Sequence, residues 1–302
     1  MIRCTLALCL SAAPLLAQSL PDGLDRLSTP VAAELGLRPA GAATAARPAP
    51  DGPPSQYDIL RAELRPGWRE PDGRHIAALH LELAPHWKTY WRAPGDSGIP
   101  PEFDWSGSRN LRALRVHWPS PEVFDFQGMQ SIGYRHEVVL PVEITPEDPS
   151  IPVELNASVA LGLCNKVCMP AALTLDLPLP PQGAPDPVIS AALAAQPMPA
   201  VQAGLTALHC TVERIEDGLR VTARMDMPRL AAVETVVMEP GGPIWVSDAT
   251  VSRDGGSLVA VADFVPPPGA PAFLDLATLR LTVLGSGDAP ARAVEVTGCP
   301  SP

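Results

Sequence analysis

The stretch VELNASVALGLCNKVCMP, residues 153–170, decides the fold class and carries the main chemical motif of the chain. Apolar residues recur at every second position from Val153 to Leu163. This period of two predicts a β-strand with one buried face. The strand runs directly into Cys164, and Cys168 follows four positions later. Two thiols at this spacing, at the end of a strand, can close a small disulfide ring.

A disulfide between Cys164 and Cys168 would stabilise the fold little, because it closes a very short loop of the unfolded chain. A short and accessible bridge is instead typical of a disulfide that opens and closes by thiol exchange. A structural bridge and a metal site remain alternatives. The metal alternative involves Met169, since thiolate and thioether sulfurs together suit Cu(I).

The first 17 residues have the pattern of a secretory signal peptide. Basic Arg3 is followed by an apolar segment, residues 5–16, and then by the small residue Ala17. We therefore expect cleavage after Ala17 and a periplasmic mature chain. The apolar segment is too short to span a bilayer, and no later segment approaches that length. We expect no membrane insertion of the mature chain.

The mature chain keeps an even number of cysteines, which in an exported protein suggests two disulfides with three possible connectivities. Spacing favours the pairs Cys164–Cys168 and Cys210–Cys299, because each pair then falls within one predicted domain. A bridge from Cys210 to Cys299 would close a long loop, worth on the order of 4–5 kcal/mol in the chain-entropy model. We expect this second bridge to be structural.

The composition narrows the class of protein. The chain has 38 prolines and 23 glycines, which argue against long helices. Its formal net charge is −11, and no cluster of lysines and arginines offers a track for phosphates. We therefore expect no nucleic-acid partner, and the acidic balance also disfavours anionic membrane surfaces.

Proline-rich breaks divide the chain into an alanine- and proline-rich linker, residues 18–55, a β-sandwich, residues 56–180, a second linker, residues 181–203, and a β-rich domain, residues 204–302. In the first domain, alternating runs separated by proline turns predict an all-β, immunoglobulin-like sandwich. Those runs are residues 59–64, 76–83, 112–118, 138–144, 153–163 and 171–177.

The second β-rich domain is also expected to be sandwich-like. Hairpin signals lie at residues 216–218 and 254–256, and the last strands are expected at residues 279–283 and 293–296. Short helices are expected near residues 31–37 and 188–195.

Three further segments have a structural and a functional interpretation. Residues 95–98 read Gly-Asp-Ser-Gly, which is similar to the nucleophile loop of trypsin-like serine proteases. The upstream histidines lie too near Ser97 in sequence for the topology of such a protease. We therefore expect residues 95–98 to form a simple turn. The aromatic strip at residues 87–91 is expected to support the core. Residues 124–128, with two phenylalanines, are expected to form an exposed loop that covers the cysteine pair, which must be shielded from stray thiols.

Residues 57–179 resemble the N-terminal periplasmic domain of the thiol:disulfide interchange protein DsbD and of its relative ScsB. The resemblance implies an immunoglobulin-like sandwich whose cysteine pair is shielded by a mobile cap loop. The motifs that carry the resemblance are, in order, residues 87–91 (WKTYW), 94–98 (PGDSG), 118–119 (WP), 125–128 (DFQG), Tyr134, 140–142 (LPV) and 164–170 (CNKVCMP).

The resemblance also implies the role of each residue. Asp125, Phe126 and Gly128 would form the cap loop, with Phe126 as the lid. Cys168 would form the mixed disulfide with partner proteins, and Cys164 would be the resolving thiol. Some family members separate the two cysteines by five residues and this chain by three, so the reduction potential cannot be carried across.

The implied activity is that of a protein-disulfide reductase, a thiol–disulfide oxidoreductase without an organic cofactor. The sequence shows no transmembrane electron importer and no thioredoxin-like domain. We therefore expect electrons from a separate DsbD- or CcdA-like membrane partner, passed on to periplasmic thioredoxin-like or disulfide-isomerase proteins. Two alternatives stay open: a Cu(I)-binding chaperone or sensor that uses Cys164, Cys168 and Met169, and a purely structural sandwich with inert disulfides.

Overall fold

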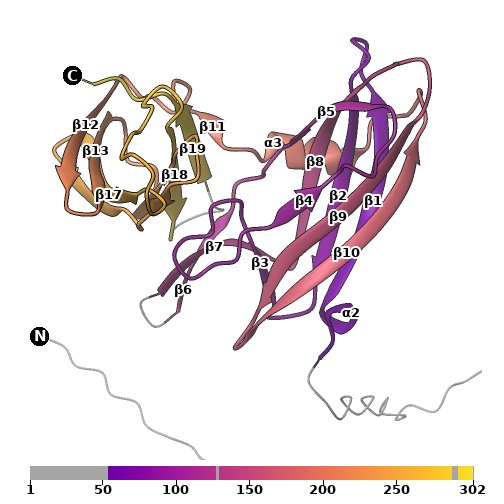
Figure 1. Cartoon of the computed structure of the whole chain (residues 1–302), viewed down its shortest axis with the longest axis horizontal. Helices are drawn as coiled ribbons and strands as arrows, with labels where there is room; N and C mark the ends of the chain where they lie inside the picture. Colours follow the sequence, from indigo (N-terminus) through magenta and orange to yellow (C-terminus); the bar gives the residue numbers. More distant parts are fainter. Residues whose placement is uncertain (1–53, 127–128, 288–291, 302) are drawn as a thin grey trace, which may run out of the picture. The chain divides into compact units, whose positions relative to one another are not determined.

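The computed structural model describes residues 54–126, 129–287 and 292–301. Residues 52–302 form one compact unit. The predicted signal peptide, the predicted helix near residues 31–37 and Gly128 lie outside the described residues, as does the predicted linker up to residue 53. Residues 60–179 build two sheets and residues 198–297 build two more (Figure 1). We call these pairs the N-terminal sandwich and the C-terminal sandwich; the exact domain boundaries stay predictions.

The N-terminal sandwich has one sheet with the order β1-β2-β8-β5 and one with the order β10-β9-β3-β7-β6, with β4 paired to β9. The strands of the first sheet are β1 (Leu60–Arg69), β2 (His75–Leu83), β5 (Leu111–Val116) and β8 (Glu137–Pro146). Those of the second are β3 (Lys88–Tyr90), β4 (Glu102–Asp104), β6 (Glu122–Phe126), β7 (Met129–Arg135), β9 (Val153–Cys164) and β10 (Cys168–Leu179).

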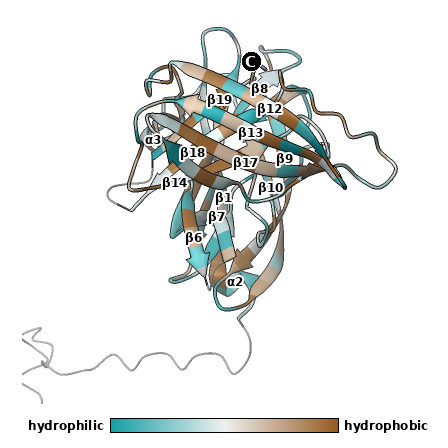
Figure 2. Ribbon diagram, turned by 90° about the vertical axis from the view of Figure 1, so that its left-hand side faces the viewer, coloured by the Kyte–Doolittle hydropathy of each residue, from teal (hydrophilic) through white to brown (hydrophobic). Residues whose placement is uncertain are grey.

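The two sheets of the N-terminal sandwich pack on each other through two clusters of buried apolar residues. Hydrophobic and hydrophilic bands follow one another along several strands (Figure 2), and apolar residues of both sheets pack together between them. The predicted all-β sandwich is thereby confirmed. The buried core includes Leu79, Leu81, Trp91, Ile132, Val138, Leu140, Leu161 and Leu163.

The expectation of an exposed loop at residues 124–128 is wrong for its first part. Glu122–Phe126 forms β6, which pairs antiparallel with β7, and Gln127 and Gly128 lie outside the described residues. The sequence analysis also missed β3 and β4. A strand of three residues is too short to show a period of two, so only its neighbours in the sheet define it.

The C-terminal sandwich has sheets with the orders β11-β19-β18-β14 and β12-β13-β17-β15, with β16 paired to β17. Both predicted hairpins are present, between β12 and β13 and between β16 and β17. Its strands are β11 (Met198–Pro199), β12 (Ala207–Ile215), β13 (Gly218–Asp226), β14 (Val233–Glu239), β15 (Trp245–Val246), β16 (Thr250–Asp254), β17 (Ser257–Val265), β18 (Arg280–Ser286) and β19 (Arg292–Thr297).

Among the described residues, two short helices complete the fold: α2 (Gln56–Ile59), before β1, and α3 (Pro187–Ala194), between the sandwiches in sequence. The predicted helix at residues 188–195 is thus confirmed. Asp186 caps α3 by accepting from the backbone amides of Val188 and Ile189, and Pro187 suits the first helical turn. The buried side chain of Ile189 packs the helix against β2 and β8. Within the described residues, neither helix is long and apolar enough to cross a membrane.

Candidate functional site

Cys164 and Cys168 are joined by a disulfide at the end of the β9–β10 hairpin, with their Cα atoms 4.1 Å apart. The two cysteines differ in access: Cys164 is fully buried, whereas Cys168 is exposed on an edge strand. The turn between them, residues 165–167, is also exposed. A partner molecule can therefore approach Cys168 and not Cys164.

The sheet register places several side chains on the same face as the disulfide, which we call the site face. Directly opposed residues of antiparallel strands point to the same side, as do alternate residues of one strand. Cys164 is opposite Lys88 of β3, which is opposite Arg135 of β7. The site face also includes Tyr90, Gly133, Ser131, Phe124 and Gly162.

Tyr90 is the residue of the site face that touches the disulfide. Its hydroxyl donates to Sγ of Cys164 at 2.7 Å and lies 3.4 Å from Sγ of Cys168. The side chain is buried, and this burial raises the pKa of Tyr90. The hydroxyl therefore stays protonated at neutral pH and remains a hydrogen-bond donor to whichever sulfur becomes negative.

Two glycines make room for Tyr90 on the site face. A Cβ atom at Gly162 would lie 3.0 Å from two carbon atoms of the Tyr90 ring, closer than side chains normally approach. A Cβ atom at Gly133, opposite Tyr90 on β7, would collide with the backbone carbonyl of Thr89. A side chain at Gly133 would therefore displace β3, and a side chain at Gly162 would press on the Tyr90 ring, so glycine at both positions leaves the room that Tyr90 occupies.

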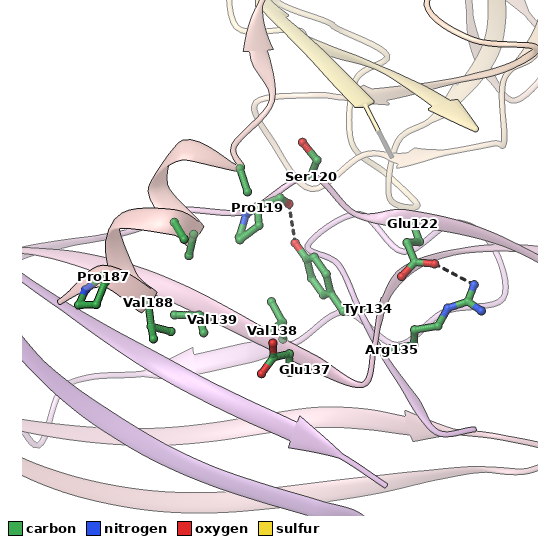
Figure 3. A pocket seen from close by; sticks show the side chains of 13 residues that line it. Pro119, Ser120, Glu122, Tyr134, Arg135, Glu137, Val138, Val139, Pro187 and Val188 are labelled. Atoms are coloured by element: carbon green, nitrogen blue, oxygen red, sulfur yellow. Dashed lines mark hydrogen bonds and ion pairs between the residues drawn. The ribbon is translucent and has the colours of Figure 1, made fainter. Parts of the chain in front are cut away.

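Phe124 lies on β6, the edge strand at the opposite end of the sheet from β10, and its ring contacts two cations. Lys88 Nζ is 4.8 Å and Arg135 Cζ is 4.7 Å from the centroid of the Phe124 ring. Lys88 also donates to Ser131 Oγ at 2.8 Å, and Arg135 pairs with Glu122 at 2.8 Å (Figure 3). These contacts hold β6 against the side chains of β3 and β7.

The two cations also set the charge of the site face. Burial, followed by the charge of Arg135, lowers the pKa of Lys88. Positive side chains near a cysteine favour its thiolate form. The site face thus provides one neutral donor, Tyr90, and one basic residue opposite Cys164, Lys88, while Glu122 balances the charge of Arg135.

The structure places the remaining predicted site residues as follows. Asp125 is exposed on β6, while the side chain of Phe126 and all of Gly128 lie outside the described residues, so the cap stays a prediction. Met169 packs against the core, opposite Leu163, on the other side of the sheet from Cys168. This separation weakens the Cu(I) alternative. Among the described residues, no group of three or more His, Cys, Asp or Glu side chains is placed to hold a metal ion.

Sequence reasoning missed Tyr90 and Lys88. It assigned residues 87–91 to core support, which holds for Trp87 and Trp91, both in the core. The intervening even-numbered residues point to the opposite side. Alternation along WKTYW, the same signal that identified the longer strands, separates the two sets once the strand is known.

Residues 61–180 match the family model described as "Thiol:disulfide interchange protein DsbD, N-terminal". This part of the chain belongs to the DsbD N-terminal family. The resemblance inferred from the sequence motifs is thereby confirmed. No curated protein matches the chain.

A solved structure extends the likeness to ScsB, a DsbD-like protein. The crystal structure of the N-terminal periplasmic domain of ScsB from Proteus mirabilis aligns with 25% sequence identity and a TM-score of 0.56, over 80% of this chain and 92% of that chain. The family model matches only residues 61–180, which is 120 of the 302 residues. The structural alignment covers 80% of the chain, a much larger share. The likeness to the ScsB domain therefore includes residues of the C-terminal sandwich.

Proposed function

We propose that the protein is a periplasmic thiol–disulfide exchange protein that passes electrons through Cys164 and Cys168. The observation that carries this proposal is a disulfide with one exposed and one buried cysteine, at a hairpin end, with the Tyr90 hydroxyl on its sulfurs. Membership of residues 61–180 in the DsbD N-terminal family supports it. The structurally similar ScsB domain is periplasmic, which agrees with the predicted signal peptide.

The proposed reaction has two exchange steps. In the reduced protein, the Cys168 thiolate attacks one sulfur of a partner's disulfide, and the partner's other sulfur leaves as a thiolate. The Cys164 thiolate then attacks Cys168 Sγ and reforms the internal bridge. The partner's bonded sulfur leaves with the electron pair and takes up a proton. Two electrons have then moved to the partner, which is reduced.

Reloading runs the same steps in reverse. A thiolate of the electron donor attacks the exposed Cys168, and Cys164 leaves as a buried thiolate. A buried charge needs a partner, and a hydrogen bond to a charged group contributes about 1.5–3 kcal/mol. The hydroxyl of Tyr90, 2.7 Å from Cys164 Sγ, is placed to donate it.

The proposed partners follow from this chemistry. We propose a DsbD- or CcdA-like membrane protein as the electron donor, and periplasmic thioredoxin-like or disulfide-isomerase proteins as recipients. Each needs a reactive cysteine that reaches Cys168 at the hairpin end.

The proposed function predicts that Cys164–Cys168 equilibrates with glutathione while Cys210–Cys299 does not. The protein would be incubated over a series of reduced-to-oxidised glutathione ratios, quenched with acid, alkylated and analysed by mass spectrometry. We expect the first pair to pass from oxidised to reduced within the series. The second pair, with both cysteines buried, serves as an internal control and stays oxidised. A first pair that stays oxidised at every ratio would refute the proposal.

We also propose that Phe126 covers the pair as the lid of the cap. Phe126→Ala should then speed the reaction of the pair with glutathione about tenfold. A tenfold change corresponds to the loss of about 1.4 kcal/mol from the free energy that keeps the cap closed. Phe273→Ala is the matched control, because Phe273 is 71% exposed on the C-terminal sandwich. An unchanged rate in Phe126→Ala, measured under pseudo-first-order conditions, would rule out the lid.

A further inference from the structure

Arg92 connects the site strand β3 to the C-terminal sandwich. It lies two residues after Tyr90, and its guanidinium forms a bidentate pair with Glu239 of β14, with both N–O distances at 2.9 Å. Arg92 Nη2 also lies 2.6 Å from Glu295 Oε2 of β19. The three side chains are 15%, 18% and 30% exposed, respectively. The guanidinium further lies 4.1 Å from the ring centroid of the fully buried Trp91.

Arg92 keeps its charge in this mostly buried position. Burial opposes the charge, but the hydrogen bonds and charges of Glu239 and Glu295 outweigh this and raise the pKa of Arg92. A planar guanidinium held by three N–O contacts has little freedom to move. The end of β3 is therefore fixed by two carboxylates that come from the other sandwich.

Further contacts join the same segment and β7 to the C-terminal sandwich. Gln130 of β7 donates to Thr235 Oγ1 at 3.5 Å. The turn at Gly95 approaches Asp248 so closely that a Cβ atom there would lie 3.3 Å from its carboxylate. Leu284 and Ala293 of the C-terminal sandwich belong to the same core cluster as Trp91 and Ile132.

The turn that resembled a protease motif thus has a structural role. Ser97 Oγ donates to the backbone carbonyl of Gln130 at 2.8 Å, and the amide of Ile132 donates to the carbonyl of Pro94 at 2.9 Å. These bonds attach the chain after Arg92 to β7. The C-terminal sandwich therefore packs on β7, the strand beside Tyr90 in the sheet, and on the segment that follows Arg92 in sequence.

The strand that carries Tyr90 depends on such anchors. With three residues, β3 is short, and its register with β9 is the single pair Lys88 and Cys164. One further bond between the two strands runs from Thr89 Oγ1 to the carbonyl of Gly162 at 3.0 Å. The hydroxyl of Tyr90 must stay within hydrogen-bond distance of Cys164 Sγ to act as a donor. Arg92 anchors the strand at the end nearest to Tyr90.

We propose that the C-terminal sandwich positions the redox site: Glu239 and Glu295 hold Arg92, and Arg92 holds β3 so that the Tyr90 hydroxyl stays on Cys164. This inference rests on the proposed exchange function and assigns a role to the C-terminal sandwich within it. Arg92 is a positioning residue that acts through Tyr90.

The test is the double variant Glu239→Gln, Glu295→Gln, which keeps the side-chain shape and removes both charges. Its matched control is Glu234→Gln on the same strand, β14. Glu234 is 2% exposed and pairs at 2.6 Å with Arg253 of its own sandwich. The reactant is dithiothreitol, whose attacking thiolate carries a single negative charge, and the rates are compared at high ionic strength so that the change in net charge of the protein has little effect on its approach.

We expect the rate of reduction of Cys164–Cys168 to fall about 5- to 30-fold in the double variant. This fall corresponds to a rise of about one or two kcal/mol in the activation free energy. In Glu234→Gln the rate should stay within about twofold of wild type. Tyr90→Phe alone should give a comparable loss. Adding the two glutamine substitutions to Tyr90→Phe should then give no further loss, because both act on the same hydroxyl.

Hydrogen exchange gives a readout that does not depend on redox activity. Backbone amides of residues 88–93 should exchange faster in the double variant and not in Glu234→Gln. Glu295→Gln alone retains the bidentate pair of Arg92 with Glu239. It replaces the double variant if the latter does not fold, with a smaller effect in the same direction.

The outcomes separate the two proposals. A wild-type pair that does not react with dithiothreitol would overturn the exchange function, while hydrogen exchange would still decide the positioning by Arg92. A wild-type rate in the double variant, or a loss that adds fully to that of Tyr90→Phe, would overturn the positioning role and leave the exchange function standing.

Discussion

Cys164→Ala protein expressed in its host is expected to carry partner proteins covalently attached through Cys168, whereas Cys168→Ala protein is expected to carry none. Cys168 is exposed and can attack a partner's disulfide, while Cys164 is buried beneath it and can only resolve the product. The resolving thiol acts within the molecule, and well-oriented intramolecular reactions have very high effective concentrations. Without it, we expect the mixed disulfide to persist at least roughly a thousandfold longer.

The measurement is acid quenching of cells, alkylation of free thiols and non-reducing electrophoresis, followed by mass spectrometry of the adducts. Dithiothreitol should release them. The double variant Cys164→Ala, Cys168→Ala controls for adducts through other cysteines. Equal amounts of adduct on Cys164 in the Cys168→Ala protein would contradict the assignment of the attacking residue.

Removal of the second disulfide is expected to have the largest effect on stability. Cys210 lies in β12, and Cys299 follows β19, so the bond joins the first long strand of the C-terminal sandwich to its end. The bond spans a sequence separation of 89 residues, and both cysteines are buried. We expect Cys210→Ala, Cys299→Ala to lower the free energy of unfolding by about 4–5 kcal/mol.

The matched comparison is Cys164→Ala, Cys168→Ala, whose bond spans a sequence separation of four. The same chain-entropy model gives about 2 kcal/mol for so short a loop. Urea denaturation followed by tryptophan fluorescence measures both losses. A larger loss at the short loop would indicate that Cys164–Cys168 is the structural bond and would contradict the division of roles between the two pairs.

Several parts of the fold were predictable because they depend on local pattern. Strands such as β2, β8, β9 and β10 are long enough for the period of two to show, and their proline-rich turns separate them. The hairpin after Ile215 follows from Asp217-Gly218, which suits a tight turn. Both disulfide pairings in the structure are the ones that spacing favours.

The site was predictable only in part. The cysteine pair was visible as a motif, and the family resemblance drew attention to Asp125 and Phe126. Phe124, by contrast, was expected in a loop and lies in β6, where it contacts Lys88 and Arg135. The cations that contact Phe124 come from two other strands, and no local sequence pattern predicts these contacts.

The sequence by itself determined the class of fold and favoured the two disulfide pairings that the structure shows, and it predicts a reactive pair and an exported chain, because strand periodicity, cysteine spacing and a signal pattern are local properties of the chain. The tertiary structure decided which side chains meet the disulfide. Tyr90 reaches Cys164 across 74 positions, and Arg92 meets Glu239 and Glu295 across 147 and 203. Periodicity states which face a residue occupies, but sheet order and core packing select its neighbours on that face, and these depend on the whole chain at once.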